Sequence, residues 1–162
     1  MATQANFAIL RQNPHRKPST IRYTEPSMGL ADVKIISGRQ TGADRAALDF
    51  AIANGIPHGG WCPKGRKAED GPIDSRYQLE ETPSADYAQR TEWNVRDSDG
   101  TVVFSIAAAL TGGSKKTVEL AQRHQKPVLH LSQEAGPASP ERALLSFIRE
   151  IELAVDENAR PA

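Results

Sequence analysis

The feature that most constrains the fold is a repeated order of a short strand, a glycine loop and a helix. Residues 33–36 (VKII) form a β-branched run that ends at Ser37-Gly38, and a helical period follows over residues 44–54. The order returns where a buried run at residues 100–104 (GTVVF) leads to the loop TGGS at 111–114. Strands that alternate with helices are typical of a parallel sheet with helices packed on it. We therefore predict one doubly wound α/β domain, with a mainly parallel sheet covered by helices on both faces.

Further elements complete this pattern. The expected segments are an extended piece at 56–61, a loop at 62–72, a short strand at 77–81, a helix at 85–96, a strand at 128–131 and an amphipathic helix at 140–155. A loop as long as 62–72 inside a compact domain is often functional. Residues 1–30 hold several prolines and no sustained apolar period, so we expect a flexible N-terminal extension, a ligand-binding domain over 31–157 and a tail at 158–162.

Charge and cysteine content exclude several classes of protein. The 20 basic and 20 acidic residues give a formal net charge of zero, so no global field favours nucleic acid or an anionic membrane. The single cysteine, Cys62, allows no intrachain disulfide, and we see no apolar run typical of a signal peptide or membrane span. We therefore expect a cytoplasmic protein whose partners are neither nucleic acid nor membrane.

The two glycine loops have the chemistry of an anion site. Gly38 and Gly42 allow close approach of the backbone to a phosphate, Thr41 adds a hydroxyl, and Arg39 adds a planar charged group. Loops of this kind lie beyond the carboxyl ends of strands, where helix N-termini present unpaired N–H groups. Neither loop has the dinucleotide or P-loop fingerprint, so those two classes lose their main support. A plain structural turn and an ordinary helix cap remain the alternatives.

Four segments of the chain carry a family resemblance. They are SGRQTGADRAAL at 37–48, GWCPKGRKAEDG at 60–71, RTEWNVRDSD at 90–99 and LTGGS at 110–114. In this order they resemble the motifs of the putative molybdenum carrier family, a YpsA-related branch of the SLOG and LOG superfamily of Rossmann-like proteins. The resemblance covers residues 33–131 and implies a Rossmann-like domain that binds molybdenum cofactor or a nucleotide as a homo-oligomer, as a carrier more than as an enzyme.

The resemblance also implies where such a ligand lies. A phosphate or oxyanion is expected on both glycine loops, with basic side chains as countercharges. The predicted ligand-binding residues are Gly38, Arg39, Gln40, Thr41, Gly42, Asp44, Lys64, Arg66, Thr111, Gly112, Gly113, Ser114 and Lys115. No directly bound metal is expected, because Cys62 is isolated and the four histidines lack the spacing of a zinc site.

A more distant resemblance gives an enzyme as the alternative. The Lonely Guy phosphoribohydrolases combine an arginine nine positions before an aspartate with a glutamate seven positions after a glycine pair. Here Arg90 precedes Asp99 by nine positions, and Glu119 follows Gly112 by seven. The resemblance implies hydrolysis of the N-glycosidic bond of a nucleoside 5'-monophosphate, assisted by Glu119 and Arg90. A surface ion pair and an exposed helix carboxylate are the simpler interpretations, and a nucleotide sensor without catalysis is a third.

Overall fold

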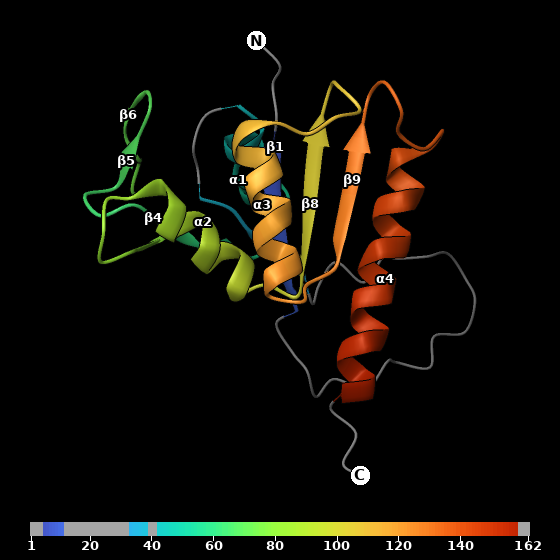
Figure 1. Ribbon diagram of the computed structural model, residues 1–162. Coiled ribbons are helices and arrows are strands. Elements are labelled where there is room, and N and C mark those ends of the chain that lie inside the picture. The colour runs from blue at the N-terminus through green and yellow to red at the C-terminus, as the bar shows by residue number, and fades with distance from the viewer. Residues whose placement is uncertain (1–4, 12–32, 39–41, 159–162) are drawn as a thin grey trace.

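The computed structural model describes residues 5–11, 33–38 and 42–158. Its main sheet has five strands in the order β3-β2-β1-β8-β9. Figure 1 shows strands β8 and β9 of this sheet side by side. The bounds are Ala5–Arg11 for β1, Val33–Ile36 for β2, His58–Gly59 for β3, Gly100–Ser105 for β8 and Val128–Ser132 for β9. The pairs β2–β3 and β8–β9 are parallel, as the sequence predicted.

Strand β1 corrects the prediction for the N-terminal residues. Residues 5–11, expected within a flexible extension, form the central strand and pair antiparallel with both β2 and β8. Ile9 is only 3% exposed and joins a core cluster with Val33 and Val102, so apolar burial stabilises this strand. The sheet is therefore mixed, and the doubly wound order is not reproduced at its centre. The rest of the predicted extension and the tail from 159 onward lie outside the described residues.

The helices are close to their predicted ranges. They are α1 (Ala43–Ala53), α2 (Tyr87–Arg96), α3 (Gly112–Arg123) and α4 (Pro140–Asn158). α1 packs Leu48 and Ala51 against Ile35 of β2, and α4 packs Phe147 and Ile151 against the cluster that contains Ile9. α2 and α3 share a third cluster with Val128 of β9. None of the helices in the described part of the chain has the length and apolar character needed to cross a bilayer.

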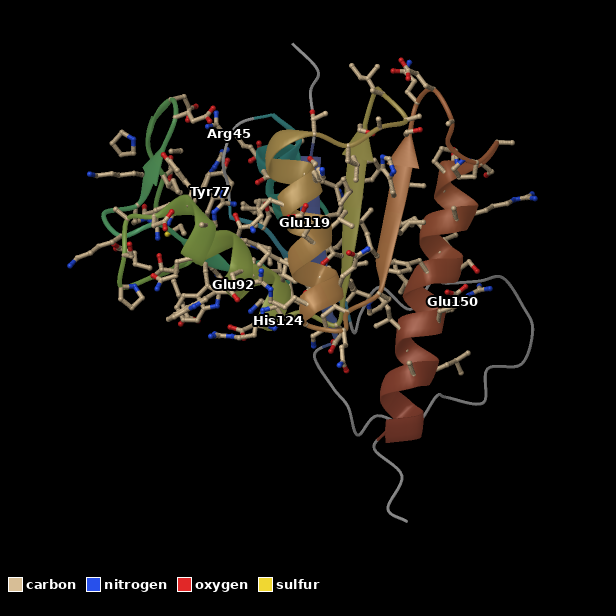
Figure 2. All side chains as sticks on the ribbon, in the orientation of Figure 1. Arg45, Tyr77, Glu92, Glu119, His124 and Glu150 are labelled. Carbon is tan, nitrogen blue, oxygen red and sulfur yellow. The ribbon has the colours of Figure 1, made fainter. Side chains whose placement is uncertain are left out.

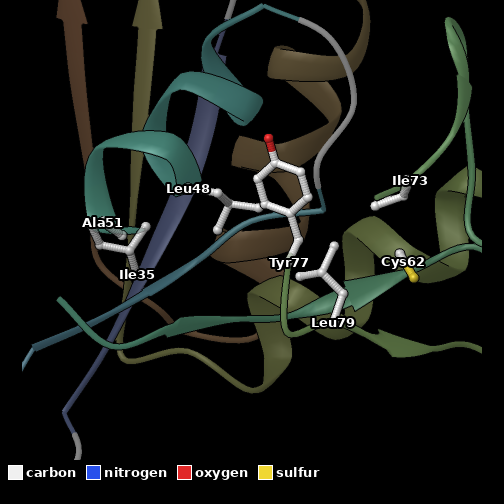
Figure 3. Packing of buried hydrophobic residues seen from close by; sticks show 7 residues of the cluster. All are labelled: Ile35, Leu48, Ala51, Cys62, Ile73, Tyr77 and Leu79. Atoms are coloured by element: carbon white, nitrogen blue, oxygen red, sulfur yellow. The ribbon is translucent and has the colours of Figure 1, made fainter. Parts of the chain in front are cut away.

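An arm formed by residues 61–81 packs against α1. It contains the parallel pair β4 (Trp61–Cys62) and β7 (Glu80–Glu81) and the hairpin β5 (Lys67–Ala68) and β6 (Gly71–Pro72), which projects from the body in Figure 1. The buried Tyr77 ring packs beside Leu48 (Figure 3), and its hydroxyl donates to Asp49 Oδ1 at 2.6 Å. At the hairpin turn, Asp70 pairs with Arg45 in the first turn of α1. The segment predicted as a loop is thus an ordered structure beside the start of α1.

Candidate ligand-binding site at the glycine loops

Both glycine loops lie at the same edge of the sheet. β1 runs antiparallel to β2 and to β8, so β2 and β8 point the same way and their carboxyl ends meet one edge. The first loop joins β2 to α1, and the second joins β8 to α3. Adjacent strands are ~4.8 Å apart, so with β1 between them the two loops begin roughly 10 Å apart. Arg39, Gln40 and Thr41 lie outside the described residues.

The first loop packs closely against helix α2 at Gly38. The Arg90 side chain of α2 lies directly under Gly38, and a Cβ at Gly38 would come within 2.2 Å of Arg90 Nη1. Only glycine allows the loop to approach Arg90 this closely. Ser37, which is buried, donates its hydroxyl to the backbone oxygen of Asp44 at 3.1 Å and so ties the loop to the first turn of α1.

Arg90 is a buried cation with incomplete hydrogen bonding. Its Nη1 lies 3.7 Å from Asp44 Oδ2, and both residues are 9% exposed. Burial lowers the pKa of Arg90 from its usual value, and the neighbouring Asp44 carboxylate opposes that shift. Arg90 Nε is buried without a hydrogen-bond partner in the part of the chain that is described. Buried polar groups are nearly always paired, so Arg90 Nε is an exception among the described residues.

The second loop is open where the first is packed. A Cβ at Gly112 or Gly113 would meet no atom within 4 Å, and Gly112 has a positive φ of 53° that favours glycine. Ser114 is 2% exposed, and its Oγ has no partner among the described residues. Neighbouring Thr117 donates its hydroxyl to the Gly113 carbonyl at 2.9 Å. The start of α3 therefore combines free space with an unused buried hydroxyl.

Among the described residues, neither helix that follows a glycine loop has a side-chain cap at its N-terminus. Neither Gly42 before α1 nor Thr111 before α3 provides a side-chain cap to its helix, whereas α2 is capped by Asp86 through a bond from the Ala88 N–H. The first N–H groups of a helix have no partner within the helix and carry the positive end of its dipole. Both loops therefore end at N–H groups suited to an anion.

Of the other basic residues predicted to bind the ligand, Lys64 and Lys115 are exposed, whereas Arg66 is engaged within the arm. Lys64 on the arm and Lys115 in the first turn of α3 are exposed. Arg66 instead holds the arm together, because its guanidinium donates to the carbonyls of four residues: Ile73, Asp74, Tyr77 and Leu79. We therefore interpret Arg66 as a structural residue of the arm and leave it out of the ligand set proposed below.

The alternative catalytic pair is not brought into contact. Glu119 lies on α3 (Figure 2), where its carboxylate is 48% exposed and lies 3.9 Å from Lys116. Arg90 pairs instead with Asp44. Among the described residues, no hydrogen bond or ion pair links Arg90 to Glu119. The spacing that suggested the pair is therefore not accompanied by a direct contact between the two groups in the described residues.

Sequence reasoning missed the residue that fixes the arm next to the first loop. Asn94 of α2 accepts from the Trp61 N–H at 2.7 Å and donates to the Trp61 carbonyl at 3.0 Å. A Cβ at Gly60 would meet both Asn94 Oδ1 and the Ser37 oxygen at 2.7 Å, so three segments converge here. An asparagine inside a helix, where its propensity is poor, was the signal that could have found it.

The second loop is anchored by polar contacts at the ends of β8 and β9. Ser105 donates its hydroxyl to the Ala107 carbonyl at 2.7 Å, and its Oγ lies 2.7 Å from His130 Nε2. Because the hydroxyl proton goes to the carbonyl, His130 is the donor in the second bond. Glu134 accepts from the Ala108 N–H at 3.1 Å. These bonds fix the backbone that leads to Thr111.

The described residues contain no cluster of three or more histidine, cysteine or acidic side chains able to hold a metal ion. Cys62 is fully buried in the core beside Tyr77, and burial raises the pKa of its thiol. A packed apolar role for Cys62 agrees with this position.

Comparison with known proteins decides the family. The family model of the circularly permuted YpsA SLOG family matches residues 35–159. The chain belongs to this family. A crystal structure of a putative molybdenum carrier protein from Syntrophus aciditrophicus SB is similar to it, with 47% sequence identity, 75% of each chain covered and a TM-score of 0.63. No curated protein matches the sequence. Strand β1 lies outside the residues that the YpsA SLOG family model matches.

Proposed function

We propose that this protein binds a phosphate-bearing small molecule, molybdenum cofactor or a nucleotide, across the two glycine loops and acts as its carrier. Membership of the YpsA SLOG family and the name of the similar crystal structure support this proposal. The family membership supports a Rossmann-like α/β fold, and the name of the similar structure, a putative molybdenum carrier, supports molybdenum cofactor as the proposed ligand. The proposal for this chain rests on its own residues at the loops.

The observation that carries the proposal is the unused donor capacity at one sheet edge. α1 and α3 both begin there without a side-chain cap, and Ser114 Oγ and Arg90 Nε are buried without a partner among the described residues. A phosphate offers several acceptor oxygens and would satisfy such donors. A ligand therefore fits these residues better than a plain turn does.

The separation of the loops favours a ligand with two polar ends. The strands that lead into the loops have β1 between them, which puts the loops roughly 10 Å apart. A single phosphate ion is too small to contact both. A pterin or a nucleoside with a phosphate at one end has about the required length. Lys64, Lys115 and Arg39 would supply countercharges to the anionic groups.

Bound molybdenum cofactor would supply its own redox chemistry. What the residues of this chain would contribute is positioning: the N–H groups at the start of one helix would hold the phosphate, those of the other would bind the opposite polar end of the ligand, and Ser114 would donate a hydrogen bond. The Gly38 backbone stays close to Arg90 and leaves room for the ligand. We further propose a homo-oligomer, which light scattering on the purified protein would measure.

Native mass spectrometry tests the function. We expect the protein to retain one molybdenum cofactor per chain, and the Ser114→Ala variant to lose most of it. Ser146→Ala, an exposed serine on α4, is the control and should bind as the wild type does. AMP serves as the second probe, with release of free adenine followed by chromatography. If the protein retains neither molybdenum cofactor nor AMP, the proposal is wrong. If it releases adenine from AMP and this release depends on Glu119, hydrolysis of the nucleotide replaces the carrier function.

A further inference from the structure

A second pocket lies at the other end of α1 from the first glycine loop. Its volume is about 500 Å³, within the ~300–1,000 Å³ typical of small-molecule sites. Its lining includes the last turn of α1, and α1 has 11 residues. At 1.5 Å per residue this helix places the pocket ~16 Å from the glycine loop. We refer to the pocket, whose lining includes Lys34, His58 and Arg76, as the basic pocket.

The lining combines basic groups with an apolar wall. Lys34 of β2, His58 of β3 and Arg76 of the arm supply the polar side, while Ile52, Ile56 and Pro57 supply the apolar side. Ile52 is 40% exposed, although it is a large apolar residue. Within the described part of the chain, no acidic side chain lines the pocket. The lining therefore favours an anion over a cation.

The Lys34 side chain lies against Gly59 of β3, which has no side chain to displace it. A Cβ at Gly59 would come within 2.7 Å of Lys34 Cε and 2.9 Å of its Nζ, so the lysine side chain crosses β3 where there is no side chain to block it. Among the interactions of the described residues, no hydrogen bond or ion pair engages the Lys34 ammonium group. Its charge is therefore available to a ligand in the basic pocket.

His58 and Arg76 are also oriented. His58 Nε2 accepts from the Gln78 N–H at 3.3 Å, so the neutral ring carries its proton on Nδ1 as a donor. Arg76 donates to Asp49 Oδ1 at 2.9 Å and stacks over the Tyr77 ring at 4.7 Å. These contacts fix the guanidinium at the rim. The pocket lining therefore contains three basic groups: the Lys34 ammonium, the His58 ring N–H and the Arg76 guanidinium.

We propose that the basic pocket binds a small organic anion, a carboxylate or phosphate monoester carried on an apolar body. The anionic group pairs with Lys34, and the apolar body covers Ile52, Ile56 and Pro57. This site is separate from the glycine loops and does not depend on the ligand proposed there. Occupation of the pocket would connect β3, the arm and the end of α1.

Isothermal titration calorimetry on the full chain tests the proposal with benzoate, phenyl phosphate and benzyl alcohol. We expect saturable binding of at least one anion, and the tighter of the two identifies the preferred head group. Benzyl alcohol, which has the apolar body without the charge, should bind much more weakly. Absence of heat with both anions, or equal binding of the alcohol, would overturn the proposal.

Single substitutions show where on the protein the anion binds. Lys34→Met should weaken anion binding about tenfold, while Lys126→Met, a lysine outside the pocket, should leave it unchanged. Gly59→Ala keeps every charge but displaces the end of Lys34, so it should weaken binding severalfold. Ser114→Ala should have no effect, because it changes the glycine loops only. Unchanged binding in Lys34→Met, or loss of binding in Ser114→Ala, would show that the basic pocket is not the site.

Discussion

The two glycine loops occupy equivalent places on the sheet edge but differ in what surrounds them. Gly38 lies against the buried Arg90 side chain, so there is no space for a side chain at residue 38. Gly113 has open space on the corresponding side, and the buried hydroxyl beside it at Ser114 has no partner among the described residues. At Gly38 the first loop is therefore closely packed against the protein. The second loop retains donors and volume that a ligand can use.

The largest expected effect on stability comes from removing the Arg90 cation, which packs against Gly38 of the first loop. Arg90→Ala removes a guanidinium that lies 3.7 Å from Asp44 Oδ2 and packs against Gly38, and breaking a buried ion pair costs roughly 3–5 kcal/mol. We expect a loss of about 3 kcal/mol in the free energy of unfolding, measured by urea denaturation. Lys116→Ala removes an exposed ion pair of α3 and should change that free energy by less than ~0.5 kcal/mol. Equal effects of the two changes would show that Arg90 does not support the first loop.

A methyl group on the first loop should have the next largest effect. Gly38→Ala forces a Cβ into the Arg90 side chain, which is buried and cannot move away freely. Overpacking of this kind costs ~1–3 kcal/mol, so the unfolding midpoint in urea should fall. An unchanged midpoint would mean that the loop can shift away from Arg90, and the contrast with the second loop would disappear.

The matched change on the second loop should act on binding and not on folding. Gly113→Ala meets open space, and alanine favours a helix over glycine by ~1 kcal/mol, so stability should stay level or rise slightly. The added methyl should still weaken binding of molybdenum cofactor or AMP, because it occupies space beside the first N–H groups of α3. Urea denaturation and calorimetry on the same sample separate the two effects. A clear loss of stability would contradict the open geometry of this loop.

The sequence predicted the elements well where local pattern determines them. The helices from α1 to α4 follow their apolar periods, and the parallel pairs β2–β3 and β8–β9 follow from alternation with helices. Strand β1 was missed because residues 5–11 form one short apolar run whose partners lie far along the chain. Pairing between distant segments is a tertiary effect that local propensity does not contain.

The sequence predicted both glycine loops as strand-to-helix connections but did not predict the side chains that pack against them. Glycine motifs identify loops from local sequence, so both loops were found. The placement of Arg90 under Gly38 and the bonds from Asn94 to Trp61 depend on how α2 packs, which spacing does not reveal. Arg66 was predicted as a countercharge from the family resemblance and its positive charge, and the structure shows its guanidinium donating to carbonyls of the arm.

A single substitution at Ser114 is the most direct test of the proposal that a ligand binds across the N-termini of α1 and α3. Its Oγ is buried without a partner in the described part of the chain, so Ser114→Ala should not lower the free energy of unfolding. A hydrogen bond to a charged group contributes ~1.5–3 kcal/mol, so the same change should weaken binding of molybdenum cofactor at least about tenfold by calorimetry. Unchanged affinity in a folded Ser114→Ala protein would contradict the account.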